Sequence, residues 1–203
     1  MNPFDRFLAN ALETVIKEEL GQRTFKKIEK RIQEKYDLKI IDAIKNFHEI
    51  DAVLREDFGK GADNIEKKII EKIIGNSREK KNSWITIYDQ KLASIILESF
   101  GDPEKKKILE YSFLQPNPIM KVVEYCNIPK TSGYRLTNEL IKNGLLVETS
   151  FETTKEGKRI GKYTALFNQV KINIGRNILH VQVLMNHDFI KTSNIINALK
   201  TIR

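Results

Sequence analysis

The sequence predicts a mainly α-helical protein with a small β-wing, an α+β fold in which an N-terminal four-helix domain precedes a winged helix-turn-helix domain. Three observations predict this fold class. Apolar residues recur at helical spacing through most of residues 1–76. Residues 118–162 contain two short helical segments followed by a hairpin pattern rich in Gly and Lys. Short segments of alternating apolar and polar residues, which are typical of strands, follow residue 83.

These patterns divide the 203 residues into four parts. Residues 1–76 are predicted to be an N-terminal helical bundle. Residues 77–83, which contain no apolar side chain, are predicted to be a polar linker. Residues 84–175 are assigned to the winged helix-turn-helix domain. Residues 176–203 are expected to form a C-terminal strand and helix that serve in packing or dimerisation.

The N-terminal part is expected to contain four helices. Asn2 can cap the first helix, with Pro3 at the first helical position, and the apolar repeat of this helix ends at Gly21. Further helices are expected over residues 22–36, 40–57 and 63–75, with a break at residues 58–61. Helices of this number and length can pack as a compact bundle.

Residues 84–114 are expected to supply one strand and two helices. Residues 84–88 alternate like a strand, and residues 89–100 have helical spacing. The next helix begins with an aspartate cap and a proline at residues 102–103. Asn117-Pro118 is expected to start the following helix in the same way.

The predicted helix-turn-helix consists of a helix after Pro118, a turn at residues 127–129 and a second helix over residues 130–142, which ends at Asn143-Gly144. At about 100° per residue, the second helix places small or apolar residues on one face. These residues are Gly133, Leu136, Thr137 and Leu140. Gly133 is expected to let a neighbouring helix approach closely.

The opposite face of helix 130–142 carries polar groups that suit DNA. Arg and Asn side chains bond bidentately to guanine and adenine edges in the major groove. The start of the helix offers backbone N–H groups and the positive end of its dipole to a phosphate. The predicted DNA-binding residues of this helix are Lys130, Thr131, Ser132, Tyr134, Arg135 and Asn138. The alternative interpretation is an ordinary surface helix whose polar face is solvated.

A basic hairpin at residues 154–162 is predicted to be the wing. Gly157 and Gly161 are expected to permit its tight reversal. A mobile basic tip suits contact with phosphates or with the minor groove, and such contact weakens with added salt. The predicted DNA-binding residues of the wing are Lys155, Lys158, Arg159 and Lys162. A solubilising loop is the alternative, because loop tips are often rich in Lys.

The positive charge of the chain is concentrated in the same part. The chain has 35 Lys and Arg against 27 Asp and Glu, a net charge of +8. Residues 1–76 contain 15 basic and 15 acidic residues, so that the whole excess lies in residues 77–203. This uneven distribution indicates a nucleic-acid footprint near the predicted helix-turn-helix.

After the wing, residues 163–167, 170–174 and 178–185 are expected to be strands, and residues 187–202 a last amphipathic helix. That helix either packs on its own domain or pairs with a copy in a homodimer. A homodimer suits a protein that reads two half-sites.

The remaining composition favours a cytoplasmic, nucleoid-associated protein with no membrane partner. No apolar run approaches the roughly 20 residues that cross a bilayer, and the N-terminus lacks the pattern of a signal peptide. The single cysteine, Cys126, cannot form an internal disulfide and is expected to lie in the core.

The predicted helix-turn-helix also resembles a known group. Residues 128–136 (IPKTSGYRL) followed by residues 140–146 (LIKNGLL) resemble archaeal winged-helix transcription regulators of the ArsR-like group. Residues 100–109 resemble the helix that opens that domain, and the resemblance covers residues 84–175. Residues 2–63 resemble a small helical domain found in ammonia-oxidising archaea. The resemblance implies a transcription regulator, but not a metal sensor, because the clustered Cys and His of metal-sensing members are missing.

The sequence therefore predicts a non-enzymatic transcriptional regulator without a cofactor or metal. Its expected partner is double-stranded DNA, it is expected to be a homodimer, and its N-terminal domain is available to a protein partner. A protein-interaction adaptor, or an architectural DNA-binding protein without sequence preference, is the alternative. An enzyme is disfavoured because the sequence has no Gly-rich phosphate loop and no HExxH, CxxC or Gly-x-Ser-x-Gly motif.

Overall fold

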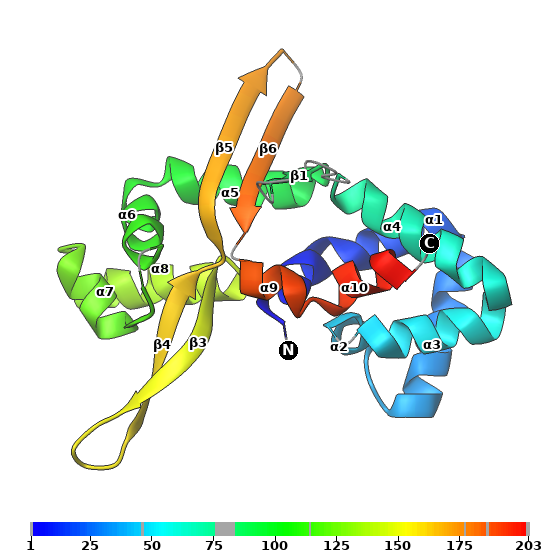
Figure 1. Ribbon diagram of the computed structural model, residues 1–203, viewed down its shortest axis with the longest axis horizontal. Coiled ribbons are helices and arrows are strands. Elements are labelled where there is room, and N and C mark those ends of the chain that lie inside the picture. The colour runs from blue at the N-terminus through cyan, green and yellow to red at the C-terminus, as the bar shows by residue number, and fades with distance from the viewer. Residues whose placement is uncertain are drawn as a thin grey trace.

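The computed structural model describes residues 2–45, 47–75, 84–113, 115–176, 178–185 and 187–201. Within these ranges the protein is mainly helical with two small antiparallel sheets, which confirms the predicted α+β class. Two hairpins project from the helical body in opposite directions, while the helices spread along the long axis (Figure 1). The predicted linker, residues 77–83, lies outside the described residues.

Helix α1 (Pro3–Tyr36) begins as the sequence predicts. The Asn2 side chain accepts hydrogen bonds from the backbone N–H groups of Phe4 and Asp5, and Pro3 occupies the first turn. Gly21 has φ 75° and ψ 156°, a conformation that favours glycine. The helix therefore kinks where the apolar repeat of the sequence ends.

Three further helices follow α1 in the N-terminal part. The helix predicted over residues 40–57 is present as α2 (Ile40–Lys45) and α3 (Phe47–Phe58), and residue 46 lies outside the described residues. The predicted break is a 3-10 turn, η1 (Gly59–Gly61), which leads into α4 (Ala62–Ile73). All three helices pack against α1.

One sheet joins segments that are distant in the sequence. Its order is β1 (Trp84–Ile87), β6 (Ile178–Met185) and β5 (Phe167–Gly175), and both pairings are antiparallel. Helix α5 (Gln90–Gly101) follows β1 and contacts β6. Its N-cap is Asp89, whose side chain accepts a hydrogen bond from the backbone of Leu92. The predicted strand and helix over residues 84–100 are thereby confirmed.

The second sheet has the order β2 (Asn117–Pro118), β4 (Arg159–Ala165) and β3 (Leu146–Thr153). The prediction that Asn117 caps a helix is wrong. Asn117 pairs with Tyr163 of β4, and its side-chain amide donates to the carbonyl of Gln115. This pairing holds Asn117 in a strand, so that the next helix starts at Ile119 without a side-chain cap.

Two other predicted elements are divided. The strand predicted over residues 163–167 is split between two sheets, because β4 ends at Ala165 and β5 begins at Phe167. The last predicted helix is split into α9 (His187–Lys191) and α10 (Asn194–Thr201). The Ser193 hydroxyl lies between these helices and caps α10 by accepting from the backbone N–H of Ile196 at 3.0 Å.

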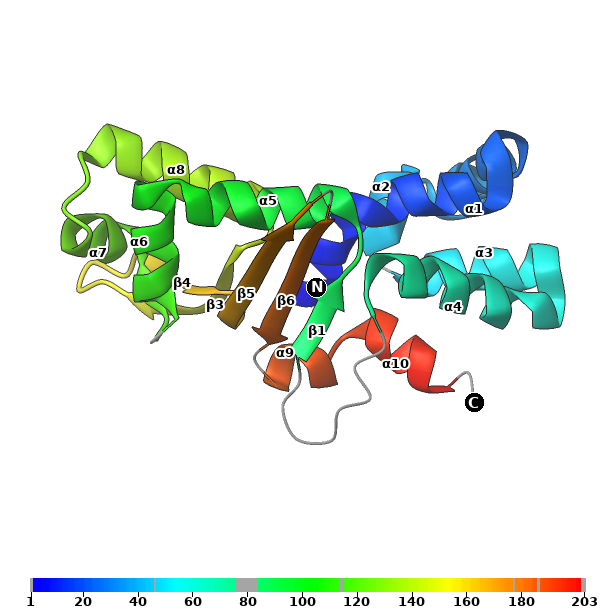
Figure 2. The same ribbon diagram turned by 90° about the horizontal axis from the view of Figure 1, so that it is seen from above.

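The first half of α1 lies in the hydrophobic core shared by the described residues. The rings of Phe7 and Phe167 meet edge to face, with centroids 5.3 Å apart. The buried carboxylate of Asp5 accepts hydrogen bonds from the hydroxyl of Ser193 and the backbone N–H of Asn194. The described residues before residue 76 thus pack directly on those after residue 83, and α10 lies beside α3 and α4 (Figure 2).

Candidate nucleic-acid interface

The candidate interface is built on three helices, α6 (Pro103–Ser112), α7 (Ile119–Tyr125) and α8 (Lys130–Lys142). As predicted, α6 begins with Asp102, whose side chain accepts from the backbone N–H groups of Glu104 and Lys105. Asn127 turns the chain between α7 and α8 with a φ of 54°. Asparagine tolerates this left-handed conformation better than most residues do.

The buried face of α8 fixes its orientation. Gly133, Leu136, Thr137 and Leu140 are all buried, as the sequence predicts. A Cβ atom at Gly133 would lie 2.4 Å from a methyl carbon of Val123 in α7, so only glycine allows the two helices to be this close. The Thr137 hydroxyl donates to the carbonyl of Gly133 at 2.9 Å, which satisfies a polar group that is fully buried.

The polar face of α8 points to solvent. Lys130, Thr131, Tyr134, Arg135 and Asn138 are exposed, while Ser132 is half-buried. No side chain caps the N-terminus of α8, which leaves its first N–H groups available to an anion. The helix-turn-helix residues predicted from the sequence therefore lie together on one accessible surface.

Arg135 is held only loosely on that surface. Its guanidinium lies 4.0 Å from the carboxylate of Glu139, and the Arg135 side chain is 68% exposed. Glu139 makes a closer ion pair of 2.5 Å with Lys105 of α6. Because Lys105 engages the same carboxylate, Arg135 can leave it at little cost in free energy.

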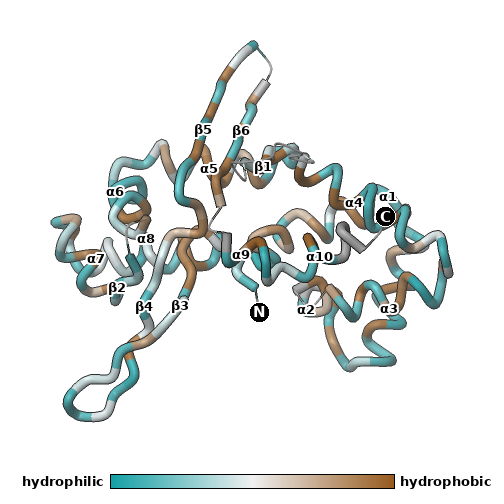
Figure 3. Tube along the Cα trace, viewed as in Figure 1, coloured by the Kyte–Doolittle hydropathy of each residue, from teal (hydrophilic) through white to brown (hydrophobic). Residues whose placement is uncertain are grey.

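The predicted wing is the hairpin of β3 and β4, whose tip is hydrophilic (Figure 3). Gly157 has a φ of 81° and supplies the reversal, with its N–H donating to the carbonyl of Thr154 at 2.9 Å. Lys155 and Lys158 are exposed at this tip. These two cations have the accessible position that the sequence predicts.

Gly161 does not contribute to the reversal, so this part of the prediction is wrong. It lies within β4, opposite Phe151. A Cβ atom at Gly161 would lie 2.9 Å from the carboxyl carbon of Glu148, so the glycine makes room for that side chain. Lys162 is half-buried in the sheet, opposite Ser150 and Pro118, rather than at the tip.

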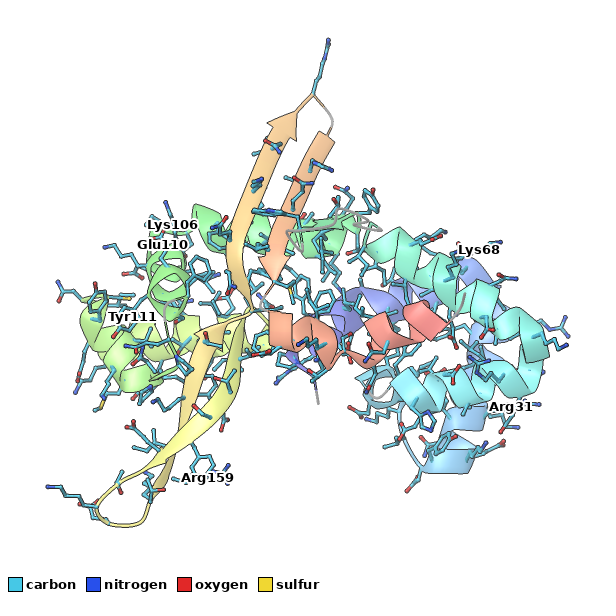
Figure 4. The ribbon with its side chains drawn as sticks, viewed as in Figure 1. Arg31, Lys68, Lys106, Glu110, Tyr111 and Arg159 are labelled. Atoms are coloured by element: carbon cyan, nitrogen blue, oxygen red, sulfur yellow. The ribbon has the colours of Figure 1, made fainter. Side chains whose placement is uncertain are left out.

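Arg159 has a partner that sequence patterns do not show. The central carbon of its guanidinium lies 3.5 Å from the centroid of the Phe151 ring, which is 49% exposed. The pair is a cation–π contact across the two strands of the hairpin. Arg159 is labelled near the outer end of this hairpin in Figure 4. The contact orients its side chain while leaving the charge accessible.

Two hollows of the surface were not predicted. One, of about 420 Å³, is lined by Lys107, Glu110, Tyr111, Tyr125 and Cys126. The rings of Tyr111 and Tyr125 are stacked with their centroids 4.0 Å apart. Cys126 is buried as predicted, and this burial raises the pKa of its thiol, which makes it a poor nucleophile at neutral pH.

The second hollow, of about 270 Å³, lies where α1, α5 and the end of α8 meet. Its lining includes three cations from three separate elements, Arg6, Lys91 and Lys142. Sequence patterns miss this group because its members are brought together only by the packing of α1 on the rest of the chain.

In the part of the chain that the structure describes, no group of three His, Cys, Asp or Glu side chains is placed to hold a metal ion. None of the described helices is both long enough and apolar enough to cross a membrane. Comparison with known proteins gave no match to a protein-family model, to a curated protein or to a solved structure.

Proposed function

We propose that the protein is a DNA-binding transcriptional regulator with a winged helix-turn-helix. In this proposal α8 enters the major groove and the β3–β4 hairpin is the wing, which follows the flanking backbone. The observation that carries the proposal is the division of α8 into two faces. One is fully buried against α7 and the body, and the other presents Arg135, Asn138 and their neighbours to solvent.

We propose two different roles for the exposed residues, reading of bases and contact with phosphates. Arg135 and Asn138 are proposed to read base edges, because their side chains have the donors and acceptors for guanine and adenine. Lys130, Thr131 and Ser132 surround the uncapped N-terminus of α8, where a backbone phosphate fits. Lys155 and Lys158 are proposed to contact phosphates without regard to sequence.

Selection of the purified protein on a random duplex library tests this function. Enrichment of particular sequences would support a regulator that reads bases. Binding without enrichment would point to an architectural role, in which α8 contributes only positive charge. Two adjacent copies of one motif in the enriched sequences would support the proposed homodimer.

An adaptor function is the second candidate, and the stacked tyrosines favour it. Tyr125 is 70% exposed, and exposed aromatic residues are enriched at protein interfaces. Capture of a protein partner that survives nuclease and high salt, and that is lost in Tyr125→Ala, would favour this function over DNA binding.

A further inference from the structure

The hollow between α1, α5 and α8 contains an unbalanced positive charge. Arg6, Lys91 and Lys142 line it, and Glu13 is the only acid among the described residues of the lining. Ala9, Asn10 and Thr14 complete the lining. No carboxylate among the described residues forms an ion pair with any of these three cations. Three cations around one hollow repel one another, and an anion in the hollow would remove this repulsion.

The positions of two cations are unfavourable for their own helices. Arg6 is the fourth residue of α1, and Lys91 is the second residue of α5. The positive end of the helix dipole disfavours a cation in the first turn. The helix dipoles therefore do not favour these two side chains, and an anion held between them would offset this cost.

Hydrogen bonds hold the walls of the hollow in place. The Asn10 side-chain amide donates to the carbonyl of Asn143, which follows α8, at 3.3 Å. The Lys91 ammonium donates to the carbonyl of Asn10 at 3.2 Å. Asn10 thus connects α1 to both α8 and α5. These two hydrogen bonds join the three helices that surround the hollow.

Lys142 connects the hollow to the proposed DNA surface. It lies eleven residues after Thr131, or about three turns, so it falls on the same exposed face of α8 as Thr131 and Asn138. The distance along the helix is roughly 16 Å. Because the major groove is about 12 Å wide, a helix that reads bases near its start reaches the backbone near its end. Figure 2 shows α8 and α1 along the same side of the molecule.

We propose that this hollow binds a phosphate group, and that the phosphate belongs to the backbone of the duplex read by α8. This inference rests on the proposed DNA-binding function and deepens it. It gives the N-terminal helix a direct part in the interface, with Arg6 and Lys91 holding one strand beside the end of α8. The ligand chemistry is a tetrahedral phosphate oxyanion, which carries one negative charge in a phosphodiester and for which an arginine and two lysines are suitable partners.

The first arm of the test measures anion binding in the hollow in the absence of DNA. Inorganic pyrophosphate is titrated into the full chain while NMR follows the side-chain amide of Asn10 and the backbone amide of Gly144. Saturable shifts are expected in the wild type. Lys142→Gln and Arg6→Gln are each expected to weaken binding about two- to fivefold, the range for one exposed charge pair. The matched control is Lys68→Gln, an exposed lysine on α4 at the other end of the molecule (Figure 4).

The second arm measures duplex affinity across a salt series. Loss of one phosphate contact is expected to reduce the slope of log affinity against log salt by about 1 in Lys142→Gln and in Arg6→Gln. The affinity deficit of each variant should then grow about eightfold for each tenfold decrease in salt. Lys68→Gln should keep the wild-type slope.

The outcomes separate this inference from the proposed function. Reduced slopes in the two hollow variants together with weakened pyrophosphate binding support it. Wild-type slopes with weakened pyrophosphate binding overturn the duplex as the source and assign the phosphate to a small free anion. If the wild type shows no pyrophosphate shifts, and Lys142→Gln and Arg6→Gln bind the duplex as Lys68→Gln does, the proposed phosphate site is overturned. The proposal that α8 binds DNA would then stand. Failure of the wild type to bind any duplex at low salt overturns the proposed function itself.

Discussion

Gly133 of α8 lies so close to Val123 of α7 that a Cβ atom at residue 133 would be 2.4 Å from Cγ1 and 2.6 Å from Cγ2 of Val123. The valine side chain is buried and cannot move away freely. The contact therefore determines how near the two helices pack. Gly133 lies on the buried face of α8, whereas Arg135 and Asn138 lie on its exposed face.

Gly133→Ala is expected to destabilise the protein by about 1–3 kcal/mol, because the added methyl group overpacks the α7–α8 contact. This loss should exceed the gain of about 1 kcal/mol that alanine brings to a helix interior. Urea unfolding measures the effect. Gly101→Ala is the control, since a Cβ atom there meets nothing within 4 Å. Adding Val123→Ala to the Gly133→Ala variant should restore part of the lost stability. A Gly133→Ala variant as stable as Gly101→Ala would contradict the proposed overpacking.

Ser193→Ala is expected to cost about 1–3 kcal/mol of stability. The substitution removes the cap of α10 and one donor to the buried carboxylate of Asp5. Burial already raises the pKa of Asp5, so loss of that donor should raise this pKa further. Thermal unfolding measures the loss, with Ser150→Ala on the exposed part of β3 as the control. Equal unfolding temperatures for the two variants would show that Asp5 and α10 do not depend on Ser193.

Glu66 is expected to make stability depend on pH. Burial raises its pKa from 4.5 to about 8, and the neighbouring carboxylate of Asp51 adds to the shift. Between pH 4.5 and 8 the folded state keeps a proton that the unfolded state loses. The free energy of unfolding therefore falls as the pH rises through this window, and below it both states are protonated.

Glu66→Gln tests this dependence because glutamine resembles the protonated acid. The variant should gain stability relative to the wild type as the pH rises from about 5 to about 8.5. Thermal unfolding at several pH values measures the difference. Glu71→Gln, an exposed position on the same helix, should follow the wild type. A constant difference between Glu66→Gln and the wild type would mean that Glu66 titrates at its ordinary pKa.

Arg135→Ala and Lys158→Ala are expected to weaken DNA binding in different ways. Loss of a base contact should cost about 1–3 kcal/mol at one base position and relax specificity there, whereas loss of a phosphate contact should weaken all duplexes alike. Competition between a selected duplex and its single-base variants measures both. An equal loss of affinity for selected and random duplexes in Arg135→Ala would show that Arg135 does not read bases.

Much of α8 and of the hairpin could be predicted from local patterns. The bounds of α8, its buried face and the close approach at Gly133 follow from helical periodicity and from the absence of a side chain at residue 133. The turn at Gly157 follows from the preference of glycine for positive φ.

Other features depend on long-range contacts that no local pattern records. Asn117 forms a strand because it pairs with Tyr163, 46 residues away. Gly161 lies within β4 beside the side chain of Glu148 rather than in a turn. Arg6, Lys91 and Lys142 form one group only because α1 folds back on α5 and α8.

Binding of the purified full chain to a duplex of about 30 base pairs, measured at several salt concentrations, is the first experiment to perform. Binding is expected at 50 mM salt, with a slope of log affinity against log salt of about −4 or steeper, since several cations would each displace counterions. No detectable binding at 50 mM salt would contradict the claim that α8 and the β3–β4 hairpin form a DNA-binding surface.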